Sequence, residues 1–214
     1  MKIAVINETS TADKNKDILA ALEGRGHEIY NAGMTKSGAT PELTYIHTGL
    51  LAAILLNLKR VDFVVGGCGT GQGFLNSVMQ YPGIVCGLIL TPLDGWLFTQ
   101  INGGNCISLA LNQGYGWAGD VNLRFIFDYI FSVERGCGYP SHRKESQRAS
   151  KQILEKINQD THRSFPEIIR VLPEAVIKPV LDYPGVEELI AVGSIDDIQL
   201  KSAFQSRMSG LLND

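Results

Sequence analysis

A glycine-rich segment from Gly66 to Gly73, set between an apolar run and a helical pattern, constrains the fold most strongly. The apolar run at 61–65 is typical of a buried strand, and residues 74–79 are typical of the start of a helix. Glycine permits positive φ angles and lets a ligand approach the backbone closely. The start of a helix adds unpaired N–H groups and a partial positive charge. This segment therefore predicts a strand–loop–helix unit whose loop binds an anionic, oxygen-rich ligand.

Strand-like and helix-like segments alternate through the first two thirds of the chain. Strands are expected at 2–7, 27–31, 60–66, 83–88 and 105–111, and helices at 14–25, 45–58, 71–80, 96–100 and 121–134. Such alternation predicts a parallel sheet covered by helices, so the expected fold class is α/β.

The remaining residues differ in composition, because charged and amide side chains dominate and apolar residues recur at helical spacing. Helices are expected at 141–160, 164–173, 175–181, 184–189 and 196–204. We therefore expect an α/β domain over residues 1–150 and a mostly helical C-terminal extension over 151–214.

Composition excludes several classes of protein. A net charge of −3 over 214 residues argues against a general nucleic-acid or membrane surface. The apolar run 50–58 is too short to cross a bilayer, and the N-terminus has the pattern of a strand rather than a signal peptide. The four cysteines show no metal-binding spacing. We therefore expect a cytoplasmic protein with reduced thiols and no metal.

Cys68 and Thr70 are the candidate catalytic residues. A helix N-terminus beside Cys68 favours the thiolate, which can attack a carbonyl or remove an acidic C–H proton next to one. The Thr70 hydroxyl either donates to a developing oxyanion together with loop amides or only caps the following helix.

Other polar groups have a structural and a functional interpretation that the sequence leaves open. Glu8, after the first strand, is a surface carboxylate or a ligand contact, and Asn102 caps a turn or contacts ligand. His47 opens an apolar helix and is a structural histidine or an acid. A basic cluster follows Pro140 and is a solvated face or a phosphate site; its members are His142, Arg143, Lys144 and Arg148.

Together these segments resemble the family of ribose 5-phosphate isomerase B and galactose-6-phosphate isomerase, over about residues 1–150. The resemblance is carried by Glu8-Thr9, His47, the Val64–Gly71 segment, Pro82-Gly83-Ile84 downstream, and Gln100–Asn105. It implies a three-layer, Rossmann-like α/β/α fold with a five-stranded parallel sheet in the order 2-1-3-5-4. It also implies a homodimer or dimer of dimers with active sites near the subunit interface, and no cofactor. The extension marks a divergent member.

The resemblance further implies aldose–ketose isomerisation of a sugar or sugar phosphate, such as ribose 5-phosphate, through a cis-enediolate. Cys68 is then the general base that moves a proton between neighbouring carbons. Thr70 and the amides of Gly69, Gly71 and Gly73 hold the enediolate oxygens. Glu8 and Asn102 contact the sugar, Arg143 and Arg148 match the arginines that hold the phosphate, and His142 beside them also binds substrate.

Four positions depart from the family pattern. Thr9 replaces a phosphate-binding histidine, Ile101 a ring-opening histidine, and Gln72 a glutamate that serves as base in one branch. The family arginine after the fifth strand falls near Asn112. Either another acid acts, with His47 or His142 of the partner subunit as candidates, or the sugar is open-chain, shorter or unphosphorylated. The alternative functions are a non-catalytic sugar-binding protein and, less supported, a hydrolase with a cysteine nucleophile.

Overall fold

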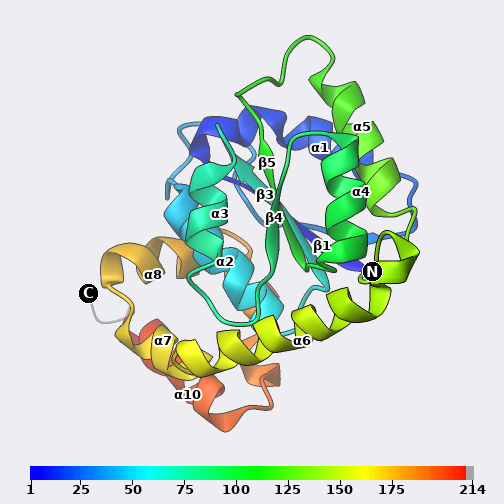
Figure 1. Cartoon of the computed structure of the whole chain (residues 1–214). Coiled ribbons are helices and arrows are strands. Elements are labelled where there is room, and N and C mark those ends of the chain that lie inside the picture. The colour runs from blue at the N-terminus through cyan, green and yellow to red at the C-terminus, as the bar shows by residue number, and fades with distance from the viewer. Residues whose placement is uncertain (211–214) are drawn as a thin grey trace.

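The computed structural model describes residues 1–210, and a five-stranded parallel sheet in the order β2-β1-β3-β5-β4 forms its centre (Figure 1). The strands are β1 (Lys2–Asn7), β2 (Glu28–Asn31), β3 (Phe63–Cys68), β4 (Cys86–Ile89) and β5 (Cys106–Ala110). Fold class and strand order are therefore as predicted.

Helices cover both faces of the sheet and make the three layers visible in Figure 1. One face carries α1 (Asn15–Leu22), α4 (Pro92–Ile101) and α5 (Gly119–Ile130), and the other carries α2 (Tyr45–Asn57) and α3 (Gln72–Val78). A short 3-10 helix, η1 (Thr9–Lys14), joins β1 to α1. Apolar side chains of β1, β3 and β5 alternate between the two faces, which separates two hydrophobic clusters.

Several element boundaries differ from the prediction: β3 begins and ends later than expected, at Phe63 and Cys68, and α5 ends earlier, at Ile130. At α4 and β4 the cause of the difference is local. Helix α4 begins at Pro92 rather than residue 96, because Thr91 and Asp94 form a capping box in which each side chain accepts the other's backbone N–H. Strand β4 begins at Cys86 rather than Gly83. The Asn105 side chain accepts a hydrogen bond from Val85 N–H at 2.9 Å and donates to Gly83 O at 2.9 Å, which holds residues 83–85 in an irregular segment before the strand.

The C-terminal extension comprises α6 (Lys144–Thr161), α7 (Phe165–Val171), α8 (Glu174–Leu181), α9 (Val186–Ile190) and α10 (Ile198–Gly210), with 3-10 turns η2 (Ser141–Arg143) and η3 (Val192–Ser194). Residues 211–214 of the predicted extension lie outside the described residues. The expected boundary at 150 falls inside α6, which runs along the edge of the sheet where the strands begin (Figure 1). Asn158 of α6 accepts a hydrogen bond from Gly83 N–H at 2.8 Å there.

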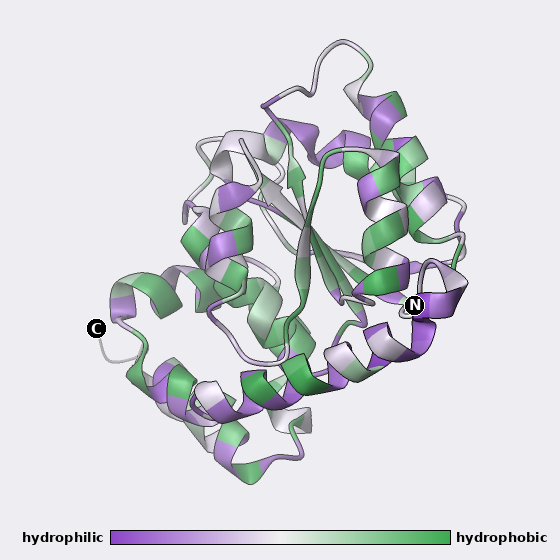
Figure 2. Cartoon of the chain, viewed as in Figure 1, coloured by the Kyte–Doolittle hydropathy of each residue, from purple (hydrophilic) through white to green (hydrophobic). Residues whose placement is uncertain are grey.

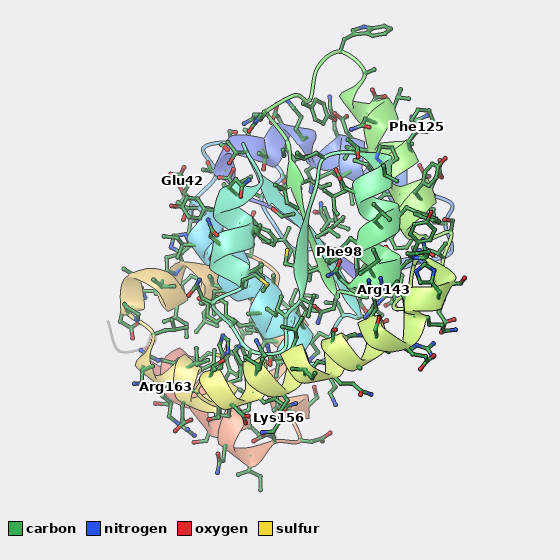
Figure 3. All side chains as sticks on the ribbon, in the orientation of Figure 1. Glu42, Phe98, Phe125, Arg143, Lys156 and Arg163 are labelled. Atoms are coloured by element: carbon green, nitrogen blue, oxygen red, sulfur yellow. The ribbon has the colours of Figure 1, made fainter. Side chains whose placement is uncertain are left out.

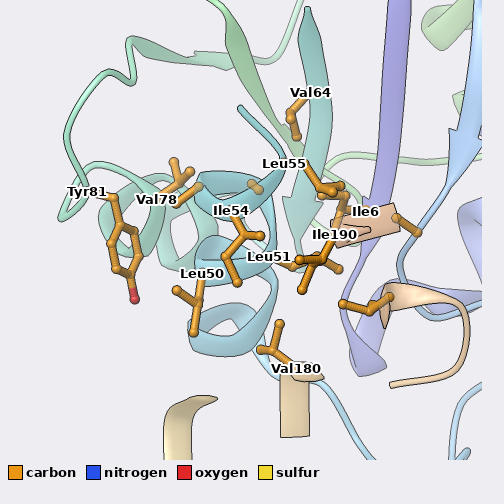
Figure 4. Close-up of a cluster of buried hydrophobic side chains, with 14 of the residues drawn as sticks. Ile6, Leu50, Leu51, Ile54, Leu55, Val64, Val78, Tyr81, Val180 and Ile190 are labelled. Carbon is orange, nitrogen blue, oxygen red and sulfur yellow. The ribbon is translucent and has the colours of Figure 1, made fainter. Parts of the chain in front are cut away.

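The extension and the sheet share one hydrophobic core. Helix α2 is apolar on all sides, and its residues Leu50–Leu55 are fully buried. Figure 4 shows Leu51, Ile54 and Leu55 of this segment in one cluster with Ile6 and Val64 of the sheet and Val180 and Ile190 of the extension. In the hydropathy view the same region is green on the ribbon (Figure 2). A helix that is hydrophobic all round needs cover on both sides, and helices α8 and α9 supply the second cover, while α7 and α10 pack against each other.

Candidate active site

Cys68 stands where the sheet changes its direction of winding. It is the last residue of β3, beside β1. Strand β2 lies on one side of this pair, and the later strands β5 and β4 lie on the other. Asn7 pairs with Gly67, so Glu8 follows β1 next to the end of β3. In open parallel sheets ligands bind at this switch point, at the carboxyl ends of the strands.

Backbone hydrogen bonds hold the glycine loop after Cys68 in place. Cys68 O accepts from Gly71 N–H at 3.2 Å and from Leu111 N–H at 3.1 Å. The buried Ser108 hydroxyl donates to Gly71 O at 2.6 Å. The Gly71 amide is thus engaged within the loop, unlike the free ligand contact expected from the sequence.

Thr70 is exposed beside the thiol and caps the following helix. Its Oγ1 accepts a hydrogen bond from Gln72 N–H at 3.3 Å, at the first residue of α3. A hydroxyl that accepts through a lone pair still has its own hydrogen to donate. Capping and donation to an oxyanion are therefore compatible at Thr70.

Glu8, Ser10 and Asn112 form the rim beside the loop. Glu8 is 4% exposed, and its carboxylate accepts hydrogen bonds from the backbone N–H of Ser10 at 3.1 Å and from the Ser10 hydroxyl. Asn112 connects this turn to the glycine loop, since its Nδ2 donates to Ser10 O and its N–H donates to Gly69 O, both at 3.0 Å. Glu8 therefore shapes the rim by capping η1, and Asn112 joins the rim to the glycine loop.

Gly73 is a glycine because of an aromatic neighbour. A Cβ at this position would lie 2.9 Å from Cγ of the Tyr45 ring, which is the first residue of α2. The close contact brings the start of α2 against the start of α3, so Tyr45 borders the site as well. This contact had no signal in the sequence.

His47 is held in a helix cap with both ring nitrogens engaged. Nδ1 accepts from Thr44 N–H at 3.0 Å, which leaves the hydrogen on Nε2 to donate to Ala175 O of the extension at 3.1 Å. A histidine fixed as this neutral tautomer between α2 and α8 has a structural role, and we do not assign it proton transfer.

The remaining predicted site residues lie at the opposite edge of the sheet from Cys68, where the strands begin rather than where they end. Asn102 caps the C-terminus of α4, and His142 and Arg143 belong to η2. Arg148 lies on α6, 3.8 Å from the Glu145 carboxylate. β3 and β5 pair from Val64 to Cys68, so the strand length of about 13 Å separates the two edges. Figure 3 shows Arg143 far from Glu42, which precedes α2 at the edge of Cys68.

The loop between β2 and α2, residues 32–44, also borders the site, although the sequence analysis assigned it no role. Ser37 Oγ donates to Thr9 O at 2.9 Å, and Thr9 N–H donates to Leu43 O at 2.9 Å. From the extension, the Tyr183 hydroxyl donates to Gly33 O at 3.2 Å. Burial raises the pKa of Tyr183, which keeps its hydroxyl a donor. The only feature of the sequence that pointed to loop 32–44 as part of the site was its position directly after the second strand.

A separate cavity of about 220 Å³ lies at the ends of β4 and β5, against α5. Leu109, Leu111 and Leu123 line it and belong to the hydrophobic cluster on the face opposite to Cys68. Tyr115 also lines it, and burial, followed by a 2.7 Å hydrogen bond to Asp17, raises the pKa of Tyr115. The cavity is therefore separate from the candidate site.

No group of three or more His, Cys, Asp or Glu side chains within residues 1–210 has the arrangement of a metal site. Over the same residues, the helices are too short or too polar to cross a bilayer.

The model of the ribose/galactose isomerase family matches residues 3–125, more than half of the sequence. The chain belongs to this family. A solved ribose-5-phosphate isomerase from Vibrio parahaemolyticus is 41% identical, with a TM-score of 0.88 and 98% of both chains covered. A 4-deoxy-L-threo-5-hexosulose-uronate ketol-isomerase, solved with a tartrate, is 36% identical, with a TM-score of 0.89 over 98% of this chain and 100% of that one. Among curated proteins, none matches significantly.

Shorter members share only the fold. The type B ribose 5-phosphate isomerase of Trypanosoma cruzi is 15% identical, with a TM-score of 0.63, and covers 75% of this chain and 98% of its own length. The two relatives above match nearly the whole chain and so include the extension. Family membership identifies the protein as a sugar isomerase, which decides between the isomerase, binding-protein and hydrolase alternatives.

Proposed function

We propose that this isomerase interconverts an open-chain sugar acid and its ketol isomer, with Cys68 as the general base. The observation that carries the proposal is the position of Cys68, at the β1/β3 switch point and directly before a glycine loop held by hydrogen bonds on both sides. Thr70 lies two residues further along the same loop.

The reaction requires one proton to move between neighbouring carbons. The Cys68 thiolate removes the proton from C2, and the C2–H electron pair forms a C1–C2 double bond while the carbonyl oxygen at C1 becomes an oxyanion. Thr70 and the amides of Gly69 and Gly73 stabilise this cis-enediolate. The Cys68 thiol then returns the proton to C1, and the hydroxyl at C2 becomes the carbonyl as its proton is transferred to the oxygen at C1.

Two replacements favour an acyclic substrate without phosphate. Ile101 occupies the position of the ring-opening histidine and cannot transfer a proton, and Thr9 occupies that of a phosphate-binding histidine. The uronate on which one relative acts has a ketone at C5 and no hydroxyl at C4, the positions through which a hexose closes its ring. It also ends in a carboxylate. An open-chain uronate of this type therefore fits both replacements.

A second copy of the chain would complete the site. Asn102, His142, Arg143 and Arg148 lie at the edge of the sheet opposite to Cys68 in the same chain. A homodimer that sets this edge of one subunit against the Cys68 edge of the other lets Asn102 contact the sugar oxygens. It also brings the basic cluster of the second copy, His142, Arg143 and Arg148, to the same site.

The test is solvent exchange at the reacting carbon. With 4-deoxy-L-threo-5-hexosulose uronate in D2O, the wild-type protein is expected to form the ketol isomer and incorporate deuterium, as followed by NMR. Cys68→Ala should lower the rate by about 10³-fold or more, in the range of a lost general base. Cys86→Ala, the same change at a half-buried thiol on β4, is the control and should retain activity. Full activity of Cys68→Ala would exclude the proposed base.

A further inference from the structure

A substrate that ends in a carboxylate needs a cation at the far end of its site. At the rim beside Cys68, the side chains of Thr9 and Asn112 are uncharged, and the Glu8 carboxylate is engaged by Ser10. Both lie on the rim by their hydrogen bonds, Thr9 to Ser37 and Asn112 to Ser10. The positive charge on this side of the site must therefore come from another element.

Two lysines lie on the segments that follow β1 and β2 at this edge, Lys14 and Lys36. Lys14 is committed elsewhere, because its ammonium contacts the Asp13 carboxylate and lies 5.2 Å from the centre of the Tyr115 ring, beside α5. Lys36 is exposed, and no carboxylate lies within salt-bridge distance of it within residues 1–210. The glycine loop and the segment 111–118 contain no cation.

The backbone of Lys36 is fixed against the rim, although its side chain is exposed. Ser37, the next residue, donates to Thr9 O at 2.9 Å, and Met34 N–H donates to Asn7 O at 2.8 Å. Tyr183 of the extension adds the hydrogen bond to Gly33 O and packs with Met34 and Leu43. The segment that carries Lys36 is thus held from both sides, so its flexible stem begins at a defined point beside Thr9.

We propose that Lys36 binds the carboxylate end of the substrate and makes the site selective for sugar acids. The inference rests on the proposed function and deepens it, because it assigns to this chain's own β2–α2 loop the charge that Thr9 and Asn112 lack. An ammonium paired with a carboxylate is a charge-assisted contact, stronger than one between neutral groups. Lys36 touches substrate away from the reacting carbons, so it acts on binding rather than on proton transfer.

The kinetic test compares Lys36→Met, Lys36→Arg and Lys59→Met on the uronate. Lys59 is an exposed lysine before β3, at the opposite edge of the sheet, and serves as the control. Lys36→Met should raise KM about ten-fold at unchanged kcat, since a hydrogen bond to a charged group is lost. Lys36→Arg should recover most of this loss, and Lys59→Met should match the wild type. A fall in kcat at unchanged KM, or an unchanged KM, would overturn the assignment.

The dependence of kcat/KM on ionic strength distinguishes a contact with the substrate from a merely structural role of Lys36. The kcat/KM of the wild type should fall as ionic strength rises, because added ions screen the attraction between Lys36 and the carboxylate. The dependence should be shallower for Lys36→Met. Equal slopes for the two proteins would contradict the proposal.

A binding measurement separates this inference from the proposed function. D-gluconate is an open-chain sugar acid without an aldehyde, and its dissociation constant can be measured by calorimetry without turnover. Lys36→Met should weaken gluconate binding about ten-fold. If this holds but the wild type leaves the uronate unchanged, the acid site is correct and the proposed substrate is wrong. If gluconate binds both proteins equally, the assignment of Lys36 is wrong, whatever the substrate.

Discussion

At Gly71 two separate constraints require glycine. Its φ is +76°, in the left-handed region, and a Cβ would lie 2.5 Å from Leu88 Cδ1 and 3.2 Å from the carbonyl carbon of Leu109. Gly24 has nearly the same φ, +75°, but a Cβ there would meet no atom within 4 Å. Comparing an alanine at Gly71 with one at Gly24 therefore separates the cost of left-handed backbone from the cost of steric overlap.

Gly71→Ala is therefore expected to cost much more than Gly24→Ala in the free energy of unfolding. Left-handed backbone costs an alanine about 1 kcal/mol, and overpacking at Gly71 adds about 1–3 kcal/mol. Urea denaturation measures both losses, and the isomerisation rate should fall only for Gly71→Ala, whose loop carries Cys68. Equal losses of stability in the two variants would show that the contacts with Leu88 and Leu109 do not matter.

Among the elements, α2 joins the sheet to the extension along its whole length. Near its start His47 donates to Ala175 O, and just past its end Arg60 reaches the extension. The Arg60 guanidinium donates to Ile190 O at 2.8 Å and to Ser194 Oγ at 2.7 Å. These contacts and the shared core make the extension part of the folded unit.

Arg60→Met should lower the free energy of unfolding by about 2 kcal/mol, because it leaves buried carbonyls near Ile190 without a donor. Arg163→Met is the matched control, since Arg163 is exposed on the short segment between α6 and α7 (Figure 3). The control should stay within about 0.5 kcal/mol of the wild type.

One transition should be seen by both circular dichroism and tryptophan fluorescence during this unfolding, because Trp96 and Trp117 lie in the α/β part while circular dichroism also reports α6–α10. Two separate transitions would contradict a shared core.

For the whole molecule, the two edges of the sheet carry different parts of the predicted site. Cys68, Thr70 and Glu8 lie at one edge, and Asn102 and Arg143 lie at the other. A site that contains both sets needs two copies in opposite orientation, which is the arrangement of a two-fold symmetric dimer.

Mixing two inactive variants tests this arrangement. Cys68→Ala and Asn102→Ala damage opposite edges, so a heterodimer of the two has one intact site and one doubly damaged site. After unfolding and refolding together, an equal mixture should recover about a quarter of the wild-type rate, because half of the dimers are heterodimers with one intact site of two. Each variant refolded alone is the control. A mixture no more active than the variants alone would mean that each site belongs to one chain.

Several features of the fold could be predicted because they depend on local pattern. The alternation of strands and helices predicted the α/β class, and the apolar run before Gly66 predicted β3 and the loop with Cys68. The longer α4 also had a local signal, since Thr91-Pro92 with Asp94 is a helix start that the apolar periodicity alone had missed. The strand order came from the family resemblance, because the loops between the strands do not specify which strands pair.

The sequence by itself determined the sheet, the helices that cover it and the strand-end loop that carries Cys68, because side-chain period and turn residues act over a few positions. Only the tertiary structure decided that His47 is a cap, since its partner Ala175 is 128 residues away. It alone placed Asn102 at the edge opposite to Cys68 and brought the segment that carries Lys36 beside Thr9, through Ser37. These facts depend on contacts between distant segments, which form only when the whole chain is packed and which no local pattern records.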